Sequence, residues 1–80
     1  MQPPKIKVGI GKVVKYDPDR KKGVIVTKQE GKLFVFDNKI EKLDEASIQD
    51  LVVQFVESIT ENGNALATQV DALGHEKYAL

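Results

Sequence analysis

Lysines and phenylalanines gathered between positions 12 and 36 are the residues best suited to form a binding site. Five of the six lysines in this stretch, at positions 12, 15, 22, 28 and 32, lie on or beside expected strands, and Phe34 and Phe36 follow the last of them. Single-stranded nucleic acids are bound by this combination, because bases stack on aromatic rings and phosphates pair with ammonium groups. The pattern therefore indicates nucleic-acid binding, and a protein–protein contact is the alternative.

Residues for catalysis or for metal binding are scarce. The chain has one histidine, His75, and no spacing pattern connects it with Ser47 or Ser58. It has no cysteine, which excludes a disulfide scaffold and a zinc or iron–sulfur site with thiolate ligands. Two acidic pairs, Asp17 with Asp19 and Asp44 with Glu45, are expected in turns or helix caps and lack the spacing of a cation-binding loop. We therefore expect no catalytic residue, no cofactor and no metal ion. The protein is not expected to be an enzyme.

Length and composition limit the chain to one small domain. It has 80 residues, of which 41% are hydrophobic and 30% charged, a balance typical of globular proteins. No apolar run reaches the roughly 18 residues of a membrane-spanning helix, and the first residues lack the apolar stretch of a signal peptide. We expect a cytoplasmic protein with one domain over residues 1–80, a core at about 8–72 and a loose tail at 73–80.

The charges are divided unevenly along the chain. Residues 1–42 carry 11 basic and five acidic residues, whereas residues 43–80 carry one basic and seven acidic residues, so a net charge of zero hides +6 and −6. A basic half can attract polyanions. A folded chain can also mix the two halves into an ordinary solvated surface, and the charges alone do not decide between these readings.

Five segments have the β-branched, alternating composition of strands, which predicts strands at residues 5–16, 23–27, 32–36, 51–59 and 65–72. Gly9 and Gly11 indicate a bend in the first strand. Asn62-Gly63 predicts a tight hairpin turn before the last strand. The polar connection at 37–50 holds no helix long enough for a parallel crossover, so we expect an all-β, mostly antiparallel sheet that closes into a five-stranded barrel.

Alternation in the second and third strands leaves apolar side chains on both faces. We expect an exposed apolar patch made of four of these side chains, Val24, Val26, Phe34 and Phe36. The core is expected to contain Val13, Ile25, Val35, Val53, Phe55 and Val70. The patch could instead be covered by the 37–50 connection or by the C-terminal tail, or it could be a homodimer or other protein interface.

Several segments follow, in order, the motifs of a known family. They are Gly11-Lys-Val-Val-Lys-Tyr-Asp17, Lys22-Gly-Val-Ile-Val26, Leu33-Phe-Val-Phe36 with Ile40, Val53-Gln-Phe55, and Asn64 to Val70. The chain therefore resembles the cold-shock domain family from about Gly11 to Val70. The resemblance implies a five-stranded antiparallel OB-fold barrel that binds single-stranded RNA or DNA by stacking bases on exposed rings.

The strand pattern and the resemblance together predict a set of binding residues: Lys12, Lys15, Tyr16, Lys22, Val24, Val26, Lys28, Phe34 and Phe36. In this interpretation the three aromatic side chains stack bases, the two valines make apolar contacts and the lysines meet phosphates. Val24 and Val26 stand where the family has phenylalanines, and Lys15 stands where it has a tryptophan. Because each lost ring removes about 1–3 kcal/mol of stacking, we expect weaker binding than in typical members.

A second hypothesis uses the same patch for a different kind of ligand. The protein could be an interaction module or a self-associating barrel, with a protein partner or a second copy on the apolar patch. The sequence thus predicts single-stranded RNA or DNA as the partner, with a homodimer or another protein as the alternative, and no contact with a membrane.

Overall fold

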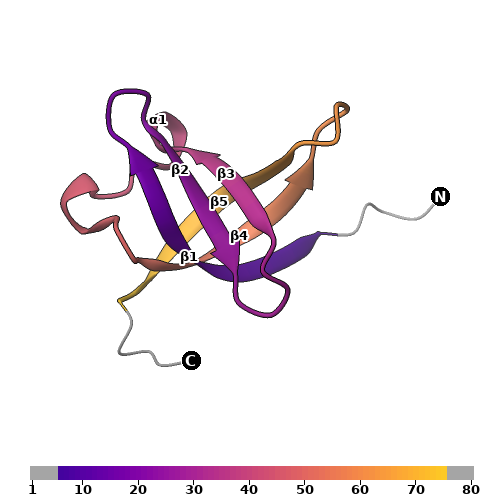
Figure 1. Ribbon diagram of the computed structural model, residues 1–80, viewed down its shortest axis with the longest axis horizontal. Helices are drawn as coiled ribbons and strands as arrows, with labels where there is room; N and C mark the ends of the chain where they lie inside the picture. The colour runs from indigo at the N-terminus through magenta and orange to yellow at the C-terminus, as the bar shows by residue number, and fades with distance from the viewer. Residues whose placement is uncertain (1–5, 76–80) are drawn as a thin grey trace.

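The fold is described for residues 6–75, in a computed structural model (Figure 1). It has five strands and two short helical turns: β1 (Lys7–Asp17), β2 (Lys22–Thr27), β3 (Leu33–Asp37), α1 (Asn38–Glu41), the 3-10 turn η1 (Glu45–Ser47), β4 (Val52–Ile59) and β5 (Ala65–Gly74). The all-β class predicted from the alternating segments is confirmed. No helix within residues 6–75 is long and apolar enough to cross a membrane.

The five strands form a closed barrel in the order β1-β2-β3-β5-β4, and β4 pairs again with β1. Four of the strand pairs are antiparallel, but β3 and β5 are parallel and meet at a single register pair, Val35 and Leu66. A mostly antiparallel five-stranded barrel, as expected from the sequence, is therefore confirmed, with one parallel pair of strands. A closed ring with an odd number of strands cannot reverse direction at every neighbour, so one parallel seam is unavoidable.

Strand β1 is long enough to belong to both sides of the barrel. Its first half pairs with β4 and its second half with β2, and the register shifts between Val13 and Lys15. Gly11 lies where the two halves meet. A Cβ atom at Gly11 would come within 2.3 Å of the Val26 carbonyl oxygen, so the close approach of β1 and β2 leaves no space for a side chain.

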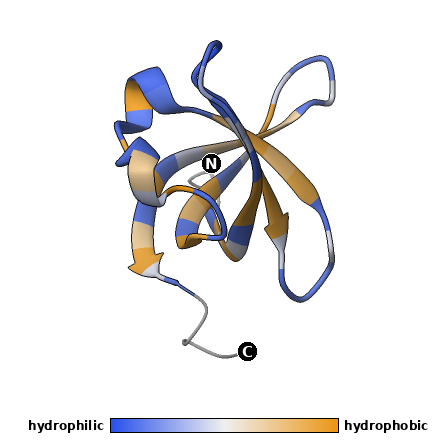
Figure 2. Cartoon of the chain, turned by 60° about the vertical axis from the view of Figure 1, so that its left-hand side comes forward, coloured by the Kyte–Doolittle hydropathy of each residue, from blue (hydrophilic) through white to orange (hydrophobic). Residues whose placement is uncertain are grey.

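The core contains all three phenylalanines, Phe34, Phe36 and Phe55, with the rings of Phe34 and Phe55 5.2 Å apart. Figure 2 shows the apolar residues concentrated on the strands and the polar residues in the loops. Burial of the predicted core residues is confirmed for all but one of them: Val13, Ile25, Val53, Phe55 and Val70. The exception is Val35, which is 37% exposed.

The predicted exposed patch is wrong for its two aromatic side chains, Phe34 and Phe36. The pairing between β2 and β3 explains why. Ile25 lies opposite Phe34, and Val24 lies opposite Val35. Directly opposed side chains project to the same face, so Phe34 enters the core with Ile25 while Val35 faces out with Val24. Phe34 and Phe36 are only 2% and 1% exposed. A shift of one residue in the predicted pairing is enough to exchange the two faces.

Gly23 is the residue that makes this register possible. It lies opposite Phe36, and a Cβ atom at Gly23 would come within 2.4 Å of the Phe36 ring. The ring therefore occupies the space that any other residue at position 23 would fill. Since an aromatic side chain buries about 150–250 Å², the register that buries Phe34 and Phe36 is favoured over one that buries Leu33 and Val35.

The C-terminal end is more ordered than the predicted tail. Strand β5 extends to Gly74, so Leu73 and Gly74 belong to the barrel. Nε2 of His75 lies 2.8 Å from the backbone carbonyl oxygen of Ser47. The rest of the predicted tail, residues 76–80, lies outside the part of the chain described here.

Replacing Phe34 tests the register directly. We expect Phe34→Ala to lower the free energy of unfolding by about 3–5 kcal/mol, because it removes a buried ring and leaves a cavity. The matched variant Val35→Ala, one residue away on the outer face, should cost about 1 kcal/mol. Urea unfolding followed by circular dichroism measures both. Similar losses for the two variants would contradict the register.

Candidate binding face

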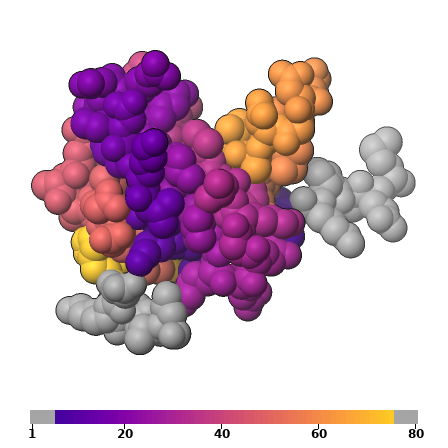
Figure 3. All heavy atoms as spheres, in the orientation of Figure 1, coloured from indigo at the N-terminus to yellow at the C-terminus, as the bar shows by residue number. Residues whose placement is uncertain are grey.

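Strands β2 and β3 present an aliphatic surface on the outside of the barrel. Val24 faces out beside Val35, and Val26 beside Leu33, which is 60% exposed. We call this surface the lysine-edged face and define it by its four aliphatic side chains and the cations around them: Val24, Val26, Leu33, Val35, Lys12, Lys15 and Lys22. Figure 3 shows β1, β2 and β3 side by side on the side turned to the viewer.

The lysines reach this face from two strands. On β1, Lys12 lies opposite Val26 and Lys15 lies opposite Val24. Lys22 lies at the start of β2, where its Nζ is 3.8 Å from Oδ2 of Asp37. Exposed ion pairs of this kind contribute about 0–1 kcal/mol, so a ligand can replace Asp37 at little cost. The rim of the face is therefore cationic around an aliphatic centre.

A depression of about 260 Å³ lies at one end of the lysine-edged face. Lys15, Arg20 and Lys22 line it together with Val24 and Val35. Nε of Arg20 is 4.0 Å from Oδ2 of Asp17, a long contact for an ion pair. Asp17 also lines the recess, so three cationic side chains and one carboxylate surround the apolar ones. The excess of positive charge suits a ligand with negative charge and apolar groups.

A second depression, of about 420 Å³, continues the apolar surface across the parallel seam between β3 and β5. Val35, Leu66 and the exposed Ile40 line it. The α1 turn crosses the seam here, and Oε1 of Glu41 accepts a hydrogen bond of 2.8 Å from the Val70 backbone N–H. The carboxylate thus binds a backbone group at the place where β3 and β5 share only one register pair.

Tyr16 is half-buried and is used inside the fold. Its ring stacks on Phe36 with centroids 6.3 Å apart, and its hydroxyl donates to Oε2 of Glu45 at 2.5 Å. The hydroxyl also accepts from Nδ2 of Asn38 at 3.2 Å. With Phe34 and Phe36 in the core, none of the three rings predicted to stack on bases stands free on the lysine-edged face.

Glu45 connects Tyr16 to the β1–β2 turn. Its Oε2 accepts a second hydrogen bond, of 2.8 Å, from Nζ of Lys21. The hydrogen bond from Lys21 is the main cause that lowers the pKa of the Glu45 carboxyl, and the bond from Tyr16 adds to it. The same contact raises the pKa of Lys21, while burial and then Glu45 raise the pKa of Tyr16. The cluster is most favourable with Glu45 charged and Tyr16 protonated.

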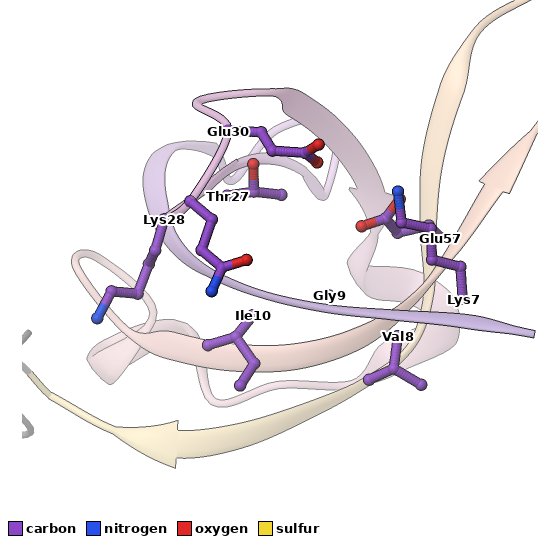
Figure 4. Close-up of a pocket in the computed structure, with 9 residues that line it drawn as sticks. Lys7, Val8, Gly9, Ile10, Thr27, Lys28, Glu30 and Glu57 are labelled. Carbon is purple, nitrogen blue, oxygen red and sulfur yellow. The ribbon is translucent and has the colours of Figure 1, made fainter.

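The predicted binding residues therefore divide into three groups. Five of them lie together on the lysine-edged face: Lys12, Lys15, Lys22, Val24 and Val26. Lys28 lies apart, in the depression of Figure 4 that Glu30 and Glu57 also line. Phe34 and Phe36 belong to the core, and Tyr16 packs against the core and hydrogen-bonds to Glu45. Sequence reasoning missed Leu33, Val35 and Ile40. For the first two, the sequence holds no signal to choose between the two apolar faces of β3.

Neither a cluster of metal ligands nor a pair formed by His75 and the Ser47 hydroxyl is found in the described region. Within residues 6–75 no cluster of three or more His, Asp or Glu side chains could hold a metal ion. The one histidine contacts the Ser47 carbonyl oxygen, whereas the Ser47 hydroxyl lies 3.4 Å from the Asp44 carbonyl oxygen. This arrangement does not pair a hydroxyl nucleophile with a base.

Comparisons with protein-family models, with curated proteins and with solved structures found no match to this chain. The functional argument therefore depends on the barrel and on the chemistry of its surface.

The Glu45 cluster predicts a pH dependence of stability. A lowered carboxyl pKa stabilises the folded state above the ordinary value of 4.5, and this contribution is lost as the pH falls through the folded-state pKa. The raised pKa values of Tyr16 and Lys21 contribute below their ordinary values of 10.0 and 10.5, and these contributions are lost as the pH rises through the folded-state values.

We therefore expect Glu45→Gln to lower the urea midpoint at pH 7, and the difference from the parent chain to shrink at pH 3. Glu61→Gln, at an exposed position of the β4–β5 turn, is the control and should leave the midpoint unchanged at pH 7. A Glu45→Gln deficit that stays the same from pH 7 to pH 3 would rule out a role for the carboxylate charge.

Proposed function

We propose that the protein is an interaction module that binds another protein through the lysine-edged face. The observation that carries this proposal is the outward pairing of Val24 with Val35 and of Val26 with Leu33 inside a rim of lysines. Protein interfaces commonly combine an apolar centre with a polar rim. The partner that fits offers aliphatic side chains surrounded by carboxylates.

Charge separates this partner from a second copy of the chain. Two lysine-edged faces in contact would bring Lys12, Lys15 and Lys22 of one copy close to the same lysines of the other. Juxtaposed like charges cost several kcal/mol at an interface. Acidic residues on the partner would instead pair with the rim and speed association. The face is therefore better suited to an acidic partner than to itself.

A second candidate function is weak binding of single-stranded RNA or DNA on the same face. It is favoured by the depression in which Lys15, Arg20 and Lys22 gather, and by the use of the strand 2–3 face for oligonucleotides in OB-type barrels, which is an argument by analogy. Without an exposed ring the contacts would be mainly to phosphates. Such binding is sequence-tolerant and strongly weakened by salt. A cytoplasmic location is part of both proposals.

Replacing a valine by a glutamate on the face tests the protein partner. A partner captured from nuclease-treated extract is purified and titrated calorimetrically against the variants. We expect Val35→Glu to weaken binding about tenfold or more, equal to about 1.4 kcal/mol, because it places a carboxylate in the aliphatic centre. Asn62→Glu, at the exposed β4–β5 turn, is the matched control and should bind like the parent chain. A partner that binds Val35→Glu normally would contradict the assignment.

A titration with a fluorescent oligothymidylate tests the nucleic-acid candidate. Phosphate binding at three cations would give a slope of about −2 for log K against log salt, and Lys15→Ala should make it shallower by about 0.7. Anisotropy at low and physiological salt measures the slope. Tight binding with this dependence would favour nucleic acid over a protein partner. No binding at low salt would eliminate the nucleic-acid candidate.

A further inference from the structure

A second apolar surface lies on β1 and β4 and adjoins the lysine-edged face at Lys12. Val8 and Ile10 are 53% and 45% exposed, and they lie opposite Val56 and Gln54 of β4. Figure 4 shows Val8 and Ile10 pointing away from the depression that holds Glu30 and Glu57. We call this surface the β1–β4 face and define it by six outward side chains: Ile6, Val8, Ile10, Gln54, Val56 and Ser58.

The nearest outward charges lie at the edges of this surface: Lys12 is two positions beyond Ile10 on β1, and Asp71 of β5 lies opposite Gln54. Lys7 and Glu57 alternate with the outward residues and form an ion pair of 3.6 Å, in which the Glu57 side chain is only 10% exposed. The six side chains of the β1–β4 face are uncharged. Among these six side chains a second copy of the same face therefore meets no like charge, in contrast to the lysine-edged face.

The order of residues on the β1–β4 face is also self-complementary. Val8 and Val56 form its central row, because they are opposite each other. A two-fold axis through this row, perpendicular to the strands, would bring Ile10 of one copy over Ile6 of the other. The same axis would bring Gln54 over Ser58, an amide over a hydroxyl. Apolar groups thus meet apolar groups on β1, and uncharged polar groups meet on β4.

We propose that the β1–β4 face joins two copies of the chain in an isologous dimer. The two sheets would pack face to face about 10 Å apart, with Val8 and Val56 of both copies at the centre. This arrangement removes Ile6, Val8 and Ile10 from water. It leaves both lysine-edged faces exposed, so the dimer would offer two binding faces to one partner, but the dimer does not depend on the function of that face.

Sedimentation equilibrium of the full chain over a range of concentrations tests the dimer. We expect the mass to rise with concentration from 8.9 kDa towards twice that value. Val8→Lys should keep the chain at the monomer mass, since it places like charges near the axis. Leu33→Lys, also exposed but on the lysine-edged face, is the matched control and should dimerise like the parent chain. Circular dichroism verifies that both variants are folded.

Cross-linking locates the contact without relying on a disruptive variant. Because the chain has no cysteine, Val56→Cys and Leu33→Cys each introduce a single thiol. A bis-maleimide linker that spans about the 10 Å between packed sheets should join two copies of Val56→Cys and leave Leu33→Cys uncoupled. A chain that stays monomeric at millimolar concentration would overturn the proposal. So would cross-linking of Leu33→Cys alone, which would place the contact on the lysine-edged face.

Discussion

The contact between Gly23 and the ring of Phe36 is the constraint on which the rest of the structure depends. It sets the register of β2 against β3, since only a residue without a side chain leaves the ring its space. That register sends Phe34 and Phe36 inward and Val24 and Val35 outward. The composition of the core and the composition of the outer face are therefore two results of one packing requirement.

Polar groups near the Phe36 ring also help to hold the barrel together. Tyr16 covers the Phe36 ring, and its hydroxyl joins Asn38 and Glu45. Glu41 supplies an acceptor to the Val70 N–H beside the parallel seam, where strand pairing is sparse. Groups that could have formed a site are used as structural ties, and the proposed binding therefore uses the lysine-edged face.

The surface is organised by charge as well as by hydropathy. Basic residues of the first half of the chain frame the aliphatic pairs of β2 and β3, whereas the β1–β4 face has uncharged outward side chains. A lysine rim favours a ligand of opposite charge, and an uncharged face allows contact with a copy of itself. The two proposed surfaces therefore suit different partners and can be occupied together.

Local pattern and composition determined the number of strands, the turns, the barrel and most of the core, because alternation and turn residues act over a few positions. Lys12, Lys15, Lys22 and the two predicted valines also lie on one face for this reason, whereas Lys28 lies apart. Which face Phe34 and Phe36 occupy was decided only by tertiary structure, since both faces of β3 are apolar and the choice depends on how β2 and β3 align. The parallel seam and the capture of Tyr16 by Glu45 likewise arise from barrel closure, which brings together residues 29 positions apart.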